Sequence, residues 1–294
     1  RLMLIKSMLS SDNQNKQKTE KMIKDKAEKN YKSIINICNK FAKNENEDLN
    51  IRYYSLILLN ILISNDNEKK YLNVDERTKK EIRSSCLVLL GNQSDLIRQY
   101  SCMIVSSLGQ ISKSINQKEW PELIPILCNG CDSNENIFKL SAIKTLNMLW
   151  DKISNGRDYF IPEDLCLMEV SLIKVMNSPP NSEIALESIK AYKTFINYIS
   201  NKFNILEYLK NSFTLLFKFC TINNINTIEV AKNSIHCITE ISKIAYEYLD
   251  VFIESLFQFF GILCKVKEEI LAIQSYIFFT ELCLDEIERK KNNR

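Results

Sequence analysis

Cys128 and Cys131 have the CxxC spacing that can hold a zinc ion or form a redox-active pair. Zinc in a structural site normally takes four Cys or His ligands, but no second CxxC follows, and the single histidine, His236, lies far along the chain. A thioredoxin-like pair would need a βαβ context, which this sequence does not provide. Because Gly130 is typical of a helix end, we interpret the two cysteines as part of a helix terminus.

Catalysis on nucleotides or phosphates would require closely spaced glycines. The five glycines stand at positions 91, 109, 130, 156 and 261 and form neither a GxxxxGK nor a GxGxxG loop. His236 lies between Ile235 and Cys237 on an amphipathic stretch, which favours a packing or surface role over that of a catalytic base. We therefore predict a protein that acts by binding, with no enzymatic activity, no cofactor and no metal.

The composition bounds the fold class. Apolar residues make up 45% of the 294 residues, while only five glycines and five prolines interrupt them, too few for a β-sandwich, a barrel or an alternating α/β fold. Apolar runs such as Ser55–Ile63 and Phe252–Leu263 end before the roughly 18 residues of a bilayer span, so we expect no membrane insertion. The net charge of +3 is close to balance and argues against a dedicated nucleic-acid binder.

The ten cysteines and the start of the chain indicate the cellular compartment in which the protein works. Most of the cysteines sit within apolar helical patterns, where a thiol behaves as a small hydrophobic group. No signal-peptide pattern opens the chain, so reduced, buried thiols are the simplest reading. We expect the cytoplasm or the nucleus.

Apolar residues recur at three- and four-residue spacing, which predicts amphipathic helices with one buried face. One stripe is formed by Ile228, Ala231, Ile235, Ile238, Ile241 and Ala245; another is formed by Leu206, Leu209, Phe213, Leu216 and Cys220. Helix-start signals agree, because Asp75 and Asn226 are residues that favour the N-cap position.

We expect these helices to form antiparallel pairs. The pairs are Leu2–Ser10 with Asn13–Lys29, Asn30–Lys43 with Leu49–Ser64, Asp75–Leu90 with Ser94–Ser112, Gln117–Cys131 with Asn134–Ile153, Ile161–Met176 with Ser182–Lys202, Ile205–Thr221 with Thr227–Leu249, and Asp250–Cys264 with Lys267–Glu286. From the second pair on, first helices begin about 40 to 45 residues apart, the period of two-helix HEAT repeats. The prediction is an all-α solenoid superhelix of about seven HEAT repeats, a single domain over residues 1–294.

Two segments leave questions open. The break Asn65–Val74 is either an extended loop or a short extra helix. The last predicted helix, Lys267–Glu286, is as apolar as its predecessors and no polar capping repeat follows it, so we expect the natural protein to continue.

Three segments resemble the amino-terminal part of importin-β, a nuclear transport receptor of the karyopherin-β family. Tyr71–Ile82, followed by a Leu-Gly pair at Leu90 and Gly91, is similar to a helix of that family, and Trp120–Pro125 is similar to its Trp-Pro-Glu-Leu-Ile-Pro signature. Near the end, Glu269–Phe279 resembles a third family segment. By this resemblance, residues from about 10 to 91 form the amino-terminal region of the receptor, and residues 92–294 form further HEAT repeats.

The resemblance implies a receptor fragment that supports protein import into the nucleus and works in the cytoplasm, the nucleus and the nuclear pore. It implies binding of the GTPase Ran in its GTP form on a concave face and of nucleoporin Phe-Gly repeats on a convex face. Importin-α or cargo would bind through later repeats. Two alternatives stay open: a cytoplasmic HEAT-repeat scaffold or adaptor without Ran dependence, and a thiol or metal enzyme built on Cys128 and Cys131.

The family's sites carry over to residues of this chain as expectations. Phe-Gly repeats would bind between first helices; the residues are Leu172, Ile173, Phe213 and Thr214 in one slot and Phe217, Phe252 and Phe259 in a second. Ran-GTP would bind polar positions of second helices; the residues are Lys21, Lys24, Arg52, Asn60, Arg98, Gln99 and Lys144. Both sets have plain alternatives, since an apolar residue at helical spacing is usually core and a lysine-rich helix is usually a solvated surface.

Overall fold

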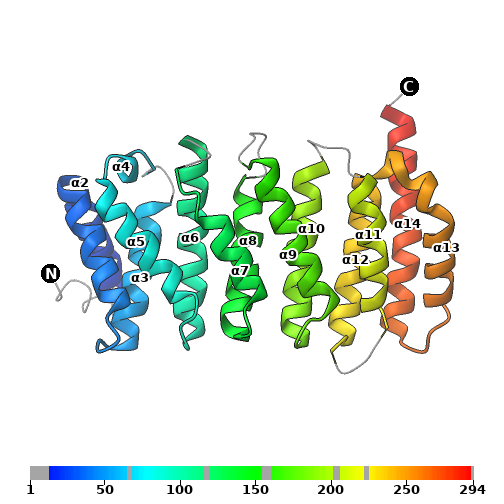
Figure 1. Cartoon of the computed structure of the whole chain (residues 1–294), viewed down its shortest axis with the longest axis horizontal. Coiled ribbons are helices and arrows are strands. Elements are labelled where there is room, and N and C mark those ends of the chain that lie inside the picture. Colours follow the sequence, from blue (N-terminus) through cyan, green and yellow to red (C-terminus); the bar gives the residue numbers. More distant parts are fainter. Residues whose placement is uncertain are drawn as a thin grey trace. The chain divides into compact units, whose positions relative to one another are not determined.

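The computed structural model of the chain describes residues 13–64, 68–115, 119–153, 160–200, 206–221 and 225–292. Every regular element in these ranges is a helix (Figure 1). They are α2 (Asn13–Lys43), α3 (Leu49–Ile63), α4 (Glu68–Leu72), α5 (Glu76–Leu89), α6 (Asp95–Ile115), α7 (Leu123–Asp132), α8 (Asn136–Ile153), α9 (Pro162–Asn177), α10 (Ser182–Ser200), α11 (Leu206–Phe219), α12 (Ile228–Ile244), the 3₁₀ helix η2 (Tyr246–Tyr248), α13 (Leu249–Leu263) and α14 (Glu269–Asn292). The predicted helix Leu2–Ser10 lies outside the described residues.

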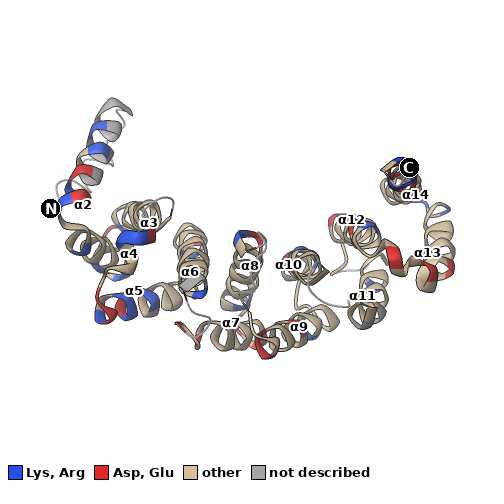
Figure 2. Ribbon diagram, turned by 90° about the horizontal axis from the view of Figure 1, so that it is seen from above, with Lys and Arg blue, Asp and Glu red and all other residues tan. Residues whose placement is uncertain are grey.

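The chain divides into two compact units, which we describe separately. Unit 1 comprises residues 1–130 and 144–161, and unit 2 comprises residues 131–143 and 162–294. In unit 1, α3 and α5 each pack against both α2 and α6. In unit 2, the second helices of the pairs, α10, α12 and α14, lie side by side in one layer, and α9, α11 and α13 form the other (Figure 2). The predicted all-α class of stacked HEAT-type helix pairs is confirmed, because each pair buries its apolar side against its neighbours.

The predicted apolar stripes form the core of unit 2. In α12, Ala231, Ile235, Ile238 and Ile241 are all buried. Ile228 was expected in the same stripe but is exposed, because it is the first residue of the helix and has no packed turn before it.

The helix starts show how local chemistry sets the boundaries. The Asp75 carboxylate accepts a hydrogen bond from the Thr78 backbone N–H at 3.2 Å, so the predicted cap of α5 is confirmed. At α12 the cap is Thr227 instead of Asn226: its hydroxyl accepts from the Val230 N–H at 3.4 Å. The Asn226 side chain donates to two carbonyls at the end of the preceding helix, which ties α11 to α12.

Several predicted boundaries shift. α7 begins at Leu123, later than predicted, and α14 continues to Asn292, beyond the predicted end at Glu286. The predicted helices Asn13–Lys29 and Asn30–Lys43 form a single α2 with non-helical backbone at Asn30 (φ −152°, ψ 66°), so the predicted break appears as a kink. The predicted helix Thr227–Leu249 was too long, because α12 ends at Ile244 and the chain continues as the 3₁₀ turn η2.

The segment after α3 contains the short helix α4, which settles the alternative left open between a loop and an extra helix. Tyr71 anchors it by complete burial, and Lys70 forms an ion pair with Glu28 of α2. The same segment therefore contacts α2 and leads directly to Asp75, the N-cap of α5.

Candidate partner-binding surfaces

Four of the predicted Phe-Gly-binding residues come together between α11 and α13 of unit 2. The ring centroids of Phe213 and Phe252 lie 5.2 Å apart, and those of Phe217 and Phe259 lie 4.0 Å apart in a stacked arrangement. The contacts continue inward, because Phe259 meets Phe260 edge-on at 5.4 Å. The second predicted slot is therefore a packed aromatic seam between two first helices, already filled in part by the chain's own rings. Phe213 was predicted for the first slot, but its ring packs against Phe252 in the second.

A hollow of about 360 Å³ opens at one end of this seam, and we call it the α11–α13 pocket. Its lining residues are Cys220, Thr221, Phe259, Ile262, Leu263, Val266, Glu268 and Leu271. Most of these side chains are apolar, and Ile262 is 67% exposed at the rim. Because an apolar cavity of about 150 Å³ can hold a benzene ring, this pocket has room for one aromatic side chain.

The residues of the first predicted slot are distributed differently. Leu172 of α9 is fully buried and belongs to the core. Ile173 beside it is half-buried, and Thr214 of α11 is exposed. Of this group, Ile173 and Thr214 are the side chains accessible to a partner.

The positions predicted for the GTPase fall into two groups, and the first is engaged within the protein. Arg52 of α3 is buried and donates from Nε to the Ala42 carbonyl at 3.1 Å. Arg98 of α6 donates from Nη1 to the Asn92 and Gln93 carbonyls at 2.6 and 2.9 Å and forms an ion pair with Asp95. Arg52 therefore holds the end of α2, which precedes its own helix. Arg98 holds the backbone at the start of α6.

The second group is more accessible. Lys21 of α2 and Gln99 of α6 are exposed, and Asn60 of α3 and Lys144 of α8 are half-buried. The side chain of Lys24 lies outside the described part of the structure.

Two half-buried tyrosines lie next to these positions and were missed by the sequence reasoning. Tyr53 of α3 and Tyr100 of α6 meet edge-to-face with ring centroids 5.2 Å apart. Burial, and then the hydrogen bond with Tyr100, raise the pKa of Tyr53 above its usual value. The sequence did contain a signal for the two tyrosines, because each lies on a second helix and directly follows a predicted position, Arg52 or Gln99.

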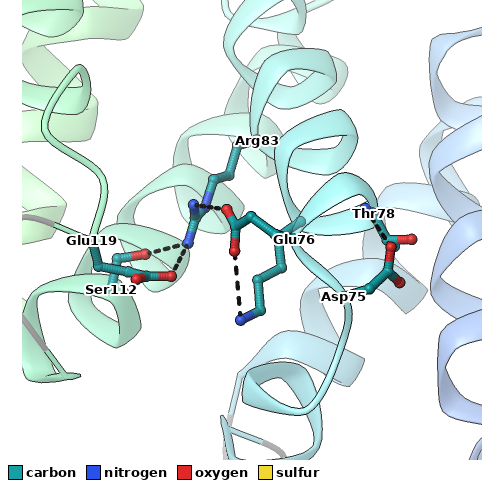
Figure 3. Close-up of polar contacts among 7 residues, drawn as sticks. Asp75, Glu76, Thr78, Arg83, Ser112 and Glu119 are labelled. Atoms are coloured by element: carbon teal, nitrogen blue, oxygen red, sulfur yellow. Dashed lines mark hydrogen bonds and ion pairs between the residues drawn. The ribbon is translucent and has the colours of Figure 1, made fainter.

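Arg83 joins two of the segments that carry the family resemblance (Figure 3). From α5 its guanidinium reaches Glu76 at 3.1 Å, Ser112 of α6 at 3.1 Å and Glu119 at 3.2 Å. The same group lies over the Trp120 ring, 5.2 Å from its centroid. One buried cation therefore positions the turn that leads into α7.

Comparison with known sequences identifies the family. A family model described as "IPO5-like, TPR repeats" matches residues 93–259, more than half of the chain. Importin subunit beta-1 of Arabidopsis thaliana is 21% identical over 262 residues, which cover 87% of this chain and 29% of that protein. The chain belongs to the importin-β (karyopherin-β) family.

Solved karyopherin-β structures share the fold. The chain aligns with Kap95p, the yeast importin-β, in a structure in which Kap95p induces the switch loops of RanGDP to adopt the GTP-bound conformation (TM-score 0.86, 16% identity). It aligns equally with Kap95 in a complex with Nup1 (TM-score 0.85, 16% identity). Both alignments cover 99% of this chain and 34% of the solved one, so the chain spans about a third of the length of these relatives.

The other groups considered for chemistry, two cysteines and one histidine, lie on α7 and α12. Cys128 and Cys131 are both buried on α7. His236 is exposed on α12. Within the described ranges, no cluster of His, Cys, Asp and Glu side chains could hold a metal ion, and no helix is both long and apolar enough to cross a membrane.

Proposed function

We propose that this chain is part of a nuclear transport receptor that binds nucleoporin Phe-Gly repeats at the α11–α13 pocket and Ran-GTP on the second helices of unit 1. The observation that carries the proposal is a mostly apolar pocket, with Phe259 as its aromatic wall, next to two first helices of a karyopherin-β chain. Solved relatives include a Kap95 complex with Nup1 and a Kap95p structure with Ran, which supports both partners.

The pocket suits a phenylalanine presented by a disordered peptide. Phe259 and Ile262 supply apolar walls, while Thr221 and Glu268 offer polar atoms to the peptide backbone. Burying one aromatic ring contributes roughly 1.5 to 3 kcal/mol, and ordering a disordered segment offsets part of that gain. Single contacts of this kind are weak and exchange rapidly, which is what transit through a pore filled with such repeats requires.

The GTPase surface would use the accessible side chains of unit 1. Lys21, Gln99 and Lys144 supply polar contacts, and the Tyr53–Tyr100 pair supplies amphipathic area of the kind enriched at protein interfaces. A partner that is recognised only through its GTP-state switch regions binds according to its bound nucleotide. Such a receptor acts by binding, in the cytoplasm, the nucleus and the pore, and importin-α or cargo would engage repeats beyond those present here.

Titration with a fluorescent peptide tests the nucleoporin half of the proposal. We expect a peptide with several Phe-Gly units to bind with a dissociation constant on the order of a millimolar per unit. A matched peptide with Ser in place of each Phe should not bind. Equal signals from the two peptides would contradict the proposal and favour the HEAT-repeat scaffold.

A further inference from the structure

Glu169 of α9 is a half-buried carboxylate in the layer of first helices of unit 2. Burial raises its pKa, because the protein partly excludes the water that would stabilise the charge. Neither a hydrogen-bond donor nor a positive charge in the described part of the chain offsets this shift. The carboxylate is therefore partly desolvated without being compensated, a state that favours a cation brought by a partner.

Two tyrosines lie near Glu169, but neither neutralises it. Burial, and then the charge of Glu169, raise the pKa of Tyr208 on α11; the same charge also acts on the buried Tyr192 of α10. The Ser212 hydroxyl donates to the Tyr208 carbonyl at 2.6 Å, so it accepts the hydroxyl proton of Tyr192, also at 2.6 Å. Tyr192 therefore has no proton left for Glu169, and the half-buried Tyr208 contributes an aromatic ring beside the carboxylate.

The charge of α9 is negative over its length. The first turn of the helix contains two further acidic residues. Its one basic residue, Lys174, already pairs with Asp132 at 2.8 Å. Directly after Glu169, Val170 is 56% exposed and supplies aliphatic surface. The accessible surface at this place thus combines a carboxylate, an aromatic ring and an apolar side chain.

We infer that Glu169 and Tyr208 form a binding site for a basic side chain, arginine or lysine, of a partner peptide. We call it the Glu169 site. A guanidinium group can pair with a carboxylate through two parallel hydrogen bonds and can also lie on an aromatic ring. The inference rests on the proposed function and deepens it, because the same peptide would place its phenylalanine in the α11–α13 pocket and gain a second contact here.

The two sites set a minimum spacing in such a peptide. Tyr208 lies in the first turn of α11, whereas Thr221, which lines the pocket, follows the end of that helix. A rise of about 1.5 Å per residue places the two positions roughly 20 Å apart along the helix. An extended peptide covers about 3.3 to 3.6 Å per residue, so its phenylalanine and its basic residue must be at least about six residues apart.

Paired peptides test the Glu169 site by fluorescence anisotropy. One peptide contains a single Phe-Gly unit and an arginine about ten residues away, and its match contains glutamine in place of the arginine. We expect the arginine peptide to bind the original chain about three- to tenfold more tightly. Both peptides should bind Glu169→Gln equally. The control Glu254→Gln removes an exposed charge from α13, another first helix, and should keep the preference for arginine.

A short spacer and a probe without phenylalanine separate this inference from the proposed function. With only about two residues between Phe and Arg, the preference should disappear. The tripeptide Gly-Arg-Gly, at about 10 mM, should shift the side-chain carboxyl resonance of Glu169 in the carbon NMR spectrum of the original chain. That resonance is assigned by its absence from Glu169→Gln.

The inference would be overturned by equal binding of the paired peptides to the original chain, or by a preference for arginine that survives in Glu169→Gln or with the short spacer. An unshifted Glu169 resonance would overturn it as well. If the glutamine peptide binds and arginine adds nothing, the Phe-Gly site stands and the Glu169 site fails. If neither peptide binds, the Phe-Gly site fails, and the NMR shift still decides the Glu169 site.

Discussion

Arg83 and Glu119 form a salt bridge of 3.2 Å that links α5 to the segment before α7. The Arg83 side chain is 7% exposed and also bonds Glu76 and Ser112. Two of the segments that carry the family resemblance, Tyr71–Gly91 and Trp120–Pro125, are therefore linked through one guanidinium group.

Arg83→Met should lower the free energy of unfolding by about 2 to 3 kcal/mol, because it leaves Glu119 and Ser112 without their partner. Arg77→Met, on the exposed side of the same helix, should change it by less than about 0.5 kcal/mol. Urea unfolding followed by circular dichroism compares them. Equal midpoints for the two variants would show that the cluster contributes nothing to stability.

Gly109 within α6 and Gly261 in the last turn of α13 should respond oppositely to alanine. A Cβ on Gly109 would lie 2.7 Å from a Leu123 methyl and 3.0 Å from a Leu149 methyl, whereas a Cβ on Gly261 would meet nothing within 4 Å. We expect Gly109→Ala to destabilise the chain by about 1 to 2 kcal/mol through overpacking, despite its better helix propensity. Gly261→Ala should stabilise it by about 0.5 to 1 kcal/mol.

The same unfolding assay distinguishes the two glycine variants. Stabilisation by Gly109→Ala would mean that Leu123 and Leu149 move aside at little cost. Destabilisation by Gly261→Ala would mean that the helix there is packed more closely than the structure indicates.

The regular part of the fold could be predicted from the sequence because burial imposes a period on it. Stripes such as Ala231, Ile235 and Ile238 identify both the helix and its buried side. Helix ends were less predictable, because neighbouring residues compete for one role: Asn226 and Thr227 are both good caps, and only packing against α11 decides that Thr227 caps α12.

The candidate sites were predictable only in part. Phe217 and Phe259 could be named in advance because the family resemblance implies binding between first helices, and both rings do lie between α11 and α13. The pocket beside them could not, because Ile262 and Leu271 come together only through the turn between α13 and α14. Arg52 was predicted as a surface contact, but its bond to the Ala42 carbonyl depends on a helix connection that spacing does not reveal.

The Asp75 carboxylate should make stability depend on pH. Its ion pair with Lys32 at 2.7 Å and its bond to Thr78 lower its pKa from 3.8 to about 2. A lowered pKa stabilises the folded state above the unfolded value, and this contribution is lost as the pH falls from about 4 to about 2. Asp75→Asn keeps the cap but loses the attraction to Lys32.

The original chain should therefore exceed Asp75→Asn in stability at pH 6, and the difference should shrink as the pH falls from about 4 through about 2. Urea midpoints measured across this range test the expectation. A difference that stays constant down to pH 2 would show that another property of the variant causes it.

Ile262 should be needed for Phe-Gly binding without being needed for folding. Ile262→Asp places a charge at the rim of the α11–α13 pocket and should weaken binding of the Phe-Gly peptide at least about tenfold. Val251→Asp changes another exposed aliphatic residue of α13, away from the pocket, and should bind as the original chain does. Fluorescence anisotropy compares them. Equal loss in both variants, or in neither, would place the peptide elsewhere.

The central claim is that this chain belongs to a transport receptor controlled by the nucleotide state of Ran. The direct measurement is binding of the purified 294-residue chain to Ran loaded with a non-hydrolysable GTP analogue and, in parallel, with GDP. We expect clear binding to the GTP-analogue form and at least about tenfold weaker binding to the GDP form. Equal binding to both forms, or no binding by a folded chain, would contradict the claim and leave a general HEAT-repeat scaffold.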